Sequence, residues 1–287
     1  MALRLNGKPV AEALGTDTAA RVAALKERGI QPCLAILRTG DDPGDQSYEA
    51  GAARRCASLG IGVRFFHCPR NVSQEEILKT VRQVNEDPSL HGCLILRPLP
   101  AHLDDGLLRG VLDPRKDVDG ITDGSLASVF SGAGKGFSPC TAEACIRILD
   151  HYGIDIQGKR AVVAGRSLVI GRPAAMLLLH RHATVTLCHT RTKDLAEICR
   201  QADILLVATG RQGVVDETCF RGGQTVLDAG IHVDAEGKIS GDVDFPLAEP
   251  LVSAITPVPG GIGAVTTAVL AAHVAEAAGR DRSGSAL

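Results

Sequence analysis

The chain has few of the features that proteins use to bind nucleic acid or to cross a membrane. It is 287 residues long and contains no Trp, and aromatic residues make up only 3% of it. Aromatic platforms for stacking bases are therefore not expected. The formal net charge of −2 at pH 7 provides no broad basic surface for nucleic acid or anionic lipid. No apolar run approaches the roughly 18 residues of a membrane span, so we expect neither a nucleic-acid partner nor a membrane partner.

The cysteines are numerous but have no pattern. There are nine, and none belongs to a C-x-x-C pair. Metal-ligand spacing is thus missing, and no metal site is predicted. An odd number of unpatterned thiols, in a chain that begins without a signal peptide, indicates reduced cysteines and a cytoplasmic location.

Short apolar runs alternate with longer amphipathic segments, which is typical of an α/β protein. The length is sufficient for two domains. Strands are expected at 33–37, 63–66, 92–96, 160–164, 184–188, 204–208 and 225–228. Helices are expected at 47–59, 141–151, 194–201 and 265–278, and two more are expected to begin at 73 and at 173. Ser73 and Glu76 can form a capping box at the start of the helix that begins at 73. This order predicts two lobes, a split domain of residues 1–120 with a C-terminal helix 268–287, and an inserted doubly wound nucleotide-binding domain of residues 121–267.

A glycine-rich turn follows the strand expected at 160–164. It begins with Gly165, Arg166 and Ser167 and reaches its next glycine at Gly171. Backbone N–H groups in such a turn, at the positive end of a helix, bind pyrophosphate. Ser167 takes the place of the second glycine of the usual G-x-G-x-x-G pattern, so an ordinary tight connection is the alternative.

The residues after the next strand favour NADP over NAD. NAD enzymes usually present a carboxylate there to the ribose hydroxyls. This chain presents hydroxyls and a guanidinium, in His189, Thr190, Arg191 and Thr192. These groups suit a 2′-phosphate, and Arg166 can add a second guanidinium. A solvated strand end is the alternative reading. Further cofactor-binding residues are expected after the last two strands, at Thr209, Gly210 and Ile231.

Several motifs together resemble the bifunctional methylenetetrahydrofolate dehydrogenase/cyclohydrolase family, over nearly the whole chain. The motifs are Gly40-Asp41-Asp42-Pro43, Tyr48, Pro98-Leu99-Pro100, Lys116-Asp117-Val118-Asp119-Gly120, Pro139-Cys140-Thr141, Gly165-Arg166-Ser167, Gly171-Arg172-Pro173 and Thr256-Pro257-Val258-Pro259-Gly260-Gly261-Ile262-Gly263. The last run is the most specific, because few folds need two Pro and three Gly in eight residues.

The resemblance implies a folate domain that faces a Rossmann domain across a cleft, and a homodimer formed through the nucleotide domain. Its dehydrogenase reaction passes a hydride from methylenetetrahydrofolate to NADP, and its cyclohydrolase reaction hydrolyses the methenyl product to formyltetrahydrofolate. Hydride transfer depends mainly on orienting two ring systems, whereas hydrolysis needs a titratable group. The implied substrate-binding residues here are Tyr48, Pro98, Leu99, Pro100, Asp119, Pro259, Gly260 and Gly261.

The chain departs from the family at the residues that move protons. The family has a Lys four residues after the Tyr, a Gln at the end of the third strand that hydrogen-bonds it, and an Asp in the D-V-D-G loop. Tyr48 and Asp119 are retained, but Ala52 and Leu96 occupy the Lys and Gln positions. We therefore expect NADP-dependent oxidation of methylenetetrahydrofolate with weak or lost cyclohydrolase activity.

Three alternatives remain at this stage. Both activities could persist through another base, although Arg54 and Arg55 stay protonated and cannot serve as one. The chain could act on another pterin or carbon–nitrogen double bond, because Asp45, Ser125 and Ala264-Val265 replace the family's Ser, Asn and Pro-Met. It could also be a non-catalytic binding or regulatory subunit.

Overall fold

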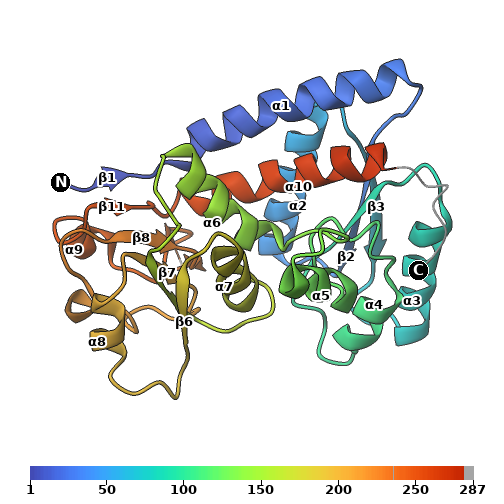
Figure 1. Cartoon of the computed structure of the whole chain (residues 1–287). Coiled ribbons are helices and arrows are strands. Elements are labelled where there is room, and N and C mark those ends of the chain that lie inside the picture. The colour runs from blue at the N-terminus through green and yellow to red at the C-terminus, as the bar shows by residue number, and fades with distance from the viewer. Residues whose placement is uncertain (235, 281–287) are drawn as a thin grey trace. The chain divides into compact units, whose positions relative to one another are not determined.

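A computed structural model describes residues 1–234 and 236–280 (Figure 1). The chain folds into two compact units. Unit 1 contains residues 1–12, 129–132 and 139–266, and unit 2 contains residues 13–128, 133–138 and 267–287. These units assign residues 1–12, 121–128, 133–138 and 267 to the opposite half from the boundaries expected on sequence. Where the functional domains begin and end stays a prediction.

Unit 1 is built on a six-stranded sheet in which every neighbouring pair is parallel. Its order is β1-β11-β8-β7-β5-β6. The strands are β1 (Leu3–Arg4), β5 (Arg160–Ala164), β6 (Thr184–Cys188), β7 (Ile204–Val207), β8 (Thr225–Asp228) and β11 (Ala254–Ile255). The central strands β5, β7 and β8 are buried apart from Arg160 at the start of β5, as expected of parallel strands covered on both faces. Strand β6 lies on one side of β5, and the next strand in the chain, β7, lies on the other side. This reversal of strand order is that of the Rossmann-like domain expected from the sequence.

Unit 2 contains a smaller parallel sheet of order β3-β2-β4. Its strands are β2 (Cys33–Thr39), β3 (Gly62–Cys68) and β4 (Gly92–Ile95). The central strand β2 is buried from Leu34 onward, and its apolar side chains pack with those of β4 and of the helix α3 (Gln74–Glu86). Both units are therefore α/β, and the expected fold class is confirmed.

The helices of the described residues include several that the sequence patterns did not predict. They are α1 (Gly7–Glu27), α2 (Pro43–Ser58), α3 (Gln74–Glu86), α4 (Asp105–Val111), α5 (Asp123–Ser131), α6 (Cys140–His151), α7 (Gly171–His180), α8 (Leu195–Arg200), the 3-10 helix η1 (Glu217–Cys219), α9 (Phe245–Ala248) and α10 (Ile262–Gly279). The helices α1, α4, α5, η1 and α9 were missed. The two-residue strands β1 and β11 were missed as well, as was the antiparallel pair of β9 (His232–Val233) and β10 (Ile239–Ser240).

Most predicted element types are correct, but some ends are wrong for identifiable reasons. Helix α2 begins at Pro43 rather than Ser47, because the Asp42 carboxylate accepts hydrogen bonds from the N–H groups of Gly44 and Asp45. The capping box of Ser73 and Glu76 at the start of α3 is confirmed. The C-terminal helix ends at Gly279, and the rest of the segment predicted to 287 lies outside the described residues, apart from Arg280.

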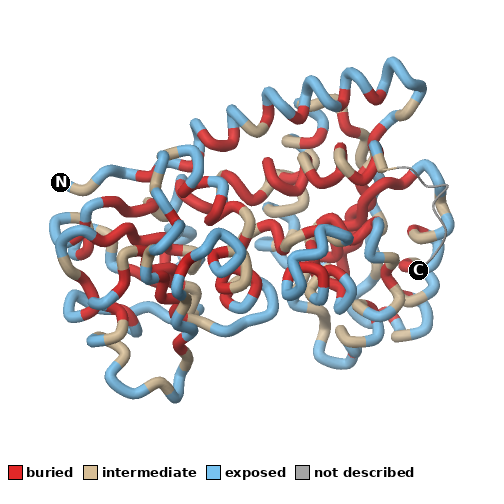
Figure 2. The backbone as a smooth tube through the Cα atoms, viewed as in Figure 1, coloured by how far each residue is buried: buried red, intermediate tan, exposed pale blue. Residues whose placement is uncertain are grey.

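Helix α10 corrects the expectation that no segment is long and apolar enough to cross a membrane. Its 18 residues pass that test by length and composition, but 67% of the window is buried inside the protein. Figure 2 shows α10 as buried along most of its length. Such burial is the pattern of a core helix, whose apolar residues face other protein rather than lipid.

Candidate active site

The glycine-rich turn leads from β5 directly into α7. The φ angle of Gly165 is 130°, and a Cβ there would lie 2.0 Å from the carbonyl oxygen of Ala208. A Cβ on Gly171 would lie 2.0 Å from the carbonyl oxygen of Gly165. Two neighbouring strands and the first turn of a helix thus approach at distances that only glycine permits. Arg166 and Ser167 are exposed at the same turn, beside the positive end of α7.

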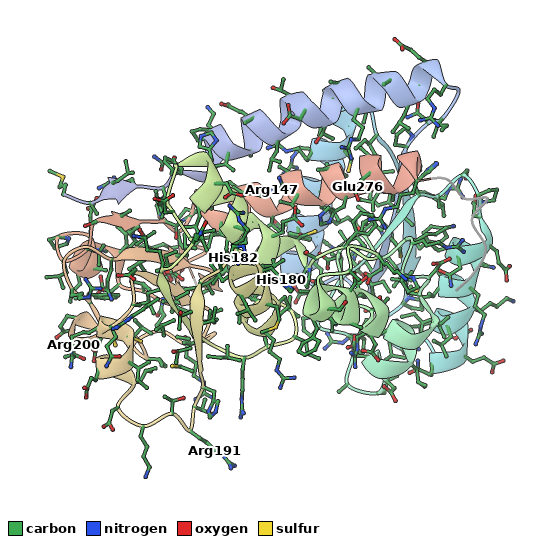
Figure 3. The ribbon with its side chains drawn as sticks, in the orientation of Figure 1. Arg147, His180, His182, Arg191, Arg200 and Glu276 are labelled. Carbon is green, nitrogen blue, oxygen red and sulfur yellow. The ribbon has the colours of Figure 1, made fainter. Side chains whose placement is uncertain are left out.

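The segment after β6 is a tight turn held by its own side chains. The hydroxyl of Thr192 accepts from the N–H of His189 at 2.8 Å, and Nδ1 of His189 accepts from the N–H of Arg191 at 3.1 Å. The His189 ring therefore stabilises the turn. Figure 3 shows the Arg191 side chain extending away from this turn. Thr190 and Arg191 are both exposed, so an anion in solvent can reach their side chains.

A buried carboxylate joins the loops after β7 and β8. Asp242 is 1% exposed, and its Oδ2 accepts from the N–H of Thr209 at 2.6 Å, from the Thr209 hydroxyl at 2.9 Å and from the N–H of Gly210 at 2.9 Å. Its Oδ1 lies 2.8 Å from Nε2 of His232. Ile231, the neighbour of His232, is 67% exposed.

A second buried carboxylate, Asp228, bonds the loop after β8 and the segment that contains Asp242. It is the last residue of β8 and accepts from the N–H groups of Gly230, Asp242 and Val243 at 2.9 to 3.1 Å. Burial raises the pKa of the Asp228 carboxyl to about 6, with a further contribution from Asp242, against the opposing effect of the three N–H donors.

In unit 2, helix α2 starts just after β2 and presents Tyr48 and Ala52 one turn apart. The Tyr48 side chain is partly exposed, whereas Ala52 is 1% exposed and packs in the core. Leu96, the residue after β4, is 4% exposed, and its N–H donates to the carbonyl of Leu37 on β2 at 2.9 Å. Both positions are thus apolar and closed to solvent.

The K-D-V-D-G loop is fixed by its first two residues. The Lys116 ammonium donates to the carbonyls of Val84 and Asp87 at 2.6 and 2.7 Å, and the Asp117 carboxylate accepts from the N–H groups of Ile121 and Thr122 at 2.9 and 2.7 Å. Asp117 is 0% exposed. Asp119 is partly exposed and does not take part in these bonds. A rigid loop therefore holds Asp119, which is what a binding residue requires.

The predicted substrate-binding residues are divided between the two units. Tyr48, the segment 98–100 and Asp119 lie in unit 2, and the segment 259–261 lies in unit 1. In unit 2, α2 begins after the carboxyl end of β2 and the segment 98–100 follows the carboxyl end of β4, so both lie at one edge of a parallel sheet. The peptide bonds Arg97-Pro98 and Val258-Pro259 are cis.

Both halves of the chain match the sequence models of one enzyme family. The model described as "Tetrahydrofolate dehydrogenase/cyclohydrolase, catalytic domain" matches residues 5–119, and "Tetrahydrofolate dehydrogenase/cyclohydrolase, NAD(P)-binding domain" matches residues 139–282. The chain belongs to the tetrahydrofolate dehydrogenase/cyclohydrolase family. It is 48% identical over 279 residues to "Bifunctional protein FolD" of Carboxydothermus hydrogenoformans, which covers 96% of this chain and 97% of that protein.

Solved structures of the family have the same fold. A bifunctional FolD enzyme from Campylobacter jejuni is 37% identical with a TM-score of 0.94, and the match covers 97% of this chain and 99% of that one. The FolD of Trypanosoma brucei, solved with NADP and an inhibitor, is 32% identical with a TM-score of 0.91 over 96% of this chain and 97% of that one. The resemblance stated from the sequence motifs is thus confirmed, and unit 1 carries the family's NAD(P)-binding domain.

The sequence patterns did not identify the residues that bond the loops and side chains next to the predicted site residues. Asp242 follows a glycine in a short polar stretch, a pattern shared by many turns, and only the fold shows that it bonds the loop after β7. In unit 2, Arg38 and Glu49, the residue after Tyr48, form a largely buried ion pair at 3.3 Å, and Nε2 of His67 lies 3.0 Å from the Glu49 carboxylate. Their partners are 11 and 18 residues apart in sequence, so no local pattern identifies them.

Proposed function

We propose that this chain oxidises methylenetetrahydrofolate to methenyltetrahydrofolate with NADP, as a step of one-carbon metabolism, and that its cyclohydrolase activity is weak or lost. NADP supplies the acceptor for the hydride. The glycine turn at Gly165 and Gly171 fits a pyrophosphate, and the turn from His189 to Thr192 offers hydroxyls and a guanidinium without a carboxylate. These features support NADP rather than NAD.

The observation that carries the proposal is the burial of Ala52 and Leu96. Hydrolysis of the methenyl product requires a group that takes a proton from water and gives one to a ring nitrogen. Neither Ala nor Leu can do so, and both side chains are at least 96% buried in apolar packing. Oxidation requires only that Tyr48, Asp119 and the cofactor loops orient the two ring systems, and those residues are retained.

The double substitution Ala52→Lys with Leu96→Gln tests the proposal. It should accelerate the hydrolysis of methenyltetrahydrofolate by about 100-fold or more, because positioned general acid–base groups contribute roughly 100- to 10,000-fold. Ala52→Met with Leu96→Gln is the matched control, since Met has a comparable length without an amine. Retained NADP-dependent oxidation verifies that the variants fold. No difference between the Lys and Met variants would contradict the proposed role of position 52.

A second candidate is a fully bifunctional enzyme, as its relatives' names describe them. One observation favours it. Asp45 lies three residues before Tyr48 and seven before Ala52, on the same face of α2. Burial, with Asp42 and Glu49 nearby, raises the pKa of the Asp45 carboxyl. Under this candidate Asp45→Asn would abolish a cyclohydrolase activity that the unchanged protein shows, and would spare the oxidation.

The proposal includes a homodimer formed through the nucleotide-binding unit and a cytoplasmic location. Strand β6 supports the dimer, because it is the edge of the six-stranded sheet and Thr184, Thr186 and Leu187 are exposed along it. An open edge strand is a template for pairing with a second copy. Sedimentation of the purified protein as a monomer at micromolar concentration would remove this part of the proposal.

A further inference from the structure

We infer that His232 is a positioning residue for the nicotinamide end of the cofactor, acting through the buried carboxylate of Asp242. This inference rests on the proposed binding of NADP but not on the proposed loss of hydrolysis. His232 is the first residue of the β9–β10 hairpin, directly after the loop that leaves β8. It is not one of the residues that the motifs assigned to the cofactor.

The strand order identifies which end of the cofactor these loops meet. A dinucleotide lies across the carboxyl edge of a doubly wound sheet, on both sides of the point where the strand order reverses. Here that point is β5, with β6 on one side and β7 and β8 on the other. The turn after β6 suits the 2′-phosphate end. The loops after β7 and β8, which contain Thr209, Gly210 and Ile231, are therefore left for the nicotinamide end.

Asp242 ties these two loops into one body. Its Oδ2 takes all three donors from the β7 loop, and its Oδ1 takes His232 at the end of the β8 loop. Because a carboxylate oxygen accepts, Nε2 of His232 carries a proton, which assigns the tautomer of a neutral ring. His232 thus connects the backbone beside Ile231 to the backbone of Thr209 and Gly210.

The backbone around Asp242 is closely packed, so the described residues offer no other donor for Oδ1 if the bond from His232 is lost. A Cβ on Gly230 would lie 2.4 Å from the carboxyl group of Asp242, and a Cβ on Gly241 would lie 1.9 Å from Oδ2 of Asp228. The side chain of Asp242 is 0% exposed, against 29% for His232. Without the imidazole, Oδ1 would be a buried acceptor beside a second carboxylate. A buried acceptor without a donor is unfavourable, and movement of the loop that carries it would relieve the cost.

The chemistry proposed for these loops is orientation rather than proton transfer. The nicotinamide carboxamide is a planar group with one acceptor and two donors. Gly210 and Ile231, in the loops after β7 and β8, are exposed residues whose backbone can pair with such a group. Binding that orients a ring contributes to the rate only while the loop geometry is held. Loss of His232 should therefore weaken contacts to the nicotinamide ring while leaving contacts to the adenosine end unchanged.

The test compares two ligands on purified protein by calorimetry. The ligands are NADP and 2′-phospho-ADP-ribose, which lacks the nicotinamide ring. His232→Ala should raise the Kd for NADP by about 10-fold and leave the Kd for 2′-phospho-ADP-ribose within about 2-fold. His232→Gln, whose amide nitrogen reaches about as far as Nε2, should restore the affinity for NADP. His180→Ala is the control, because Nε2 of His180, labelled in Figure 3, bonds the carbonyl of Val129 at 2.8 Å, away from these loops.

Each other outcome has a definite meaning. Equal weakening of both ligands by His232→Ala would show a general structural role and overturn the inference. Failure of His232→Gln to restore affinity, with its fold intact by circular dichroism, would overturn the role of the bond to Asp242. If the unchanged protein binds 2′-phospho-ADP-ribose no better than ADP-ribose, the proposed preference for NADP fails, and NAD with ADP-ribose then tests the same role of His232.

Discussion

Asp228 makes the stability of the nucleotide-binding unit depend on pH. Its carboxyl is 3% exposed, and burial raises its pKa from 3.8 to about 6 despite three backbone donors. A folded-state pKa above the unfolded one means that the protonated form is favoured by folding. The contribution of this group to stability is therefore complete below about pH 4 and is lost as the pH rises through 6.

This shift predicts the titration of Asp228. Its carboxyl carbon should titrate by NMR with a midpoint near pH 6, assigned by comparison with Asp228→Asn. Relative to that variant, the free energy of unfolding of the unchanged protein should fall by about 3 kcal/mol between pH 4 and pH 7. A midpoint below pH 4 would show that the backbone donors outweigh burial.

Residue identity was predictable where a role depends on a local pattern, and not where it depends on the fold. Gly165 and Gly171 stood out because a glycine-rich turn between a strand and a helix is the local pattern of a pyrophosphate-binding loop. The absence of a Lys at position 52 stood out because the motif around Tyr48 fixes how this chain aligns with the family. Asp242 did not, because its partners Thr209 and His232 are 33 and 10 residues away.

Among the elements, helix α2 matters most for the folate side, since it presents Tyr48. Its start was placed four residues too late from the sequence, because Pro43 and Gly44 suggest a turn. Proline is nevertheless favoured in the first turn of a helix, and Asp42 supplies the cap. The long helix α1 was missed because its large apolar residues are few and many of its positions are exposed; the large ones are Val10, Leu14, Val22 and Leu25.

The cap of α2 yields a prediction. Asp42→Ala should lower the free energy of unfolding by about 1 kcal/mol, because the N–H groups of Gly44 and Asp45 lose their acceptor. Asp42→Ser should keep most of this stability, because the Ser hydroxyl can accept the same bonds. Urea denaturation measures both, with Asp17→Ala on the exposed face of α1 as the control. An Asp42→Ala variant as stable as the unchanged protein would mean that the cap bonds are not formed in solution.

At the scale of the whole molecule, the alternation of elements was enough to predict two α/β units, and the resemblance to the family added a doubly wound nucleotide-binding domain. The order of the strands in the two sheets was not predicted, because β1 and β11 are only two residues long and give no local pattern. The exposed edge β6 predicts a dimer, and Leu187→Lys on that edge should shift the protein toward monomer in sedimentation velocity. Leu251→Lys, at another exposed apolar position, is the matched control. A dimer that resists the charge at 187 would indicate that β6 is not the interface.

The activity of the whole enzyme is tested most directly by one assay on the unchanged protein. Methylenetetrahydrofolate and NADP are mixed with it, and the absorbances of the reduced nicotinamide and of the methenyl product are followed together. With Ala52 and Leu96 buried in apolar packing, methenyltetrahydrofolate should accumulate with the reduced cofactor and disappear only at its spontaneous rate. Methenyltetrahydrofolate that disappears faster than in the enzyme-free blank would contradict the account and show that another group has taken over the proton transfer.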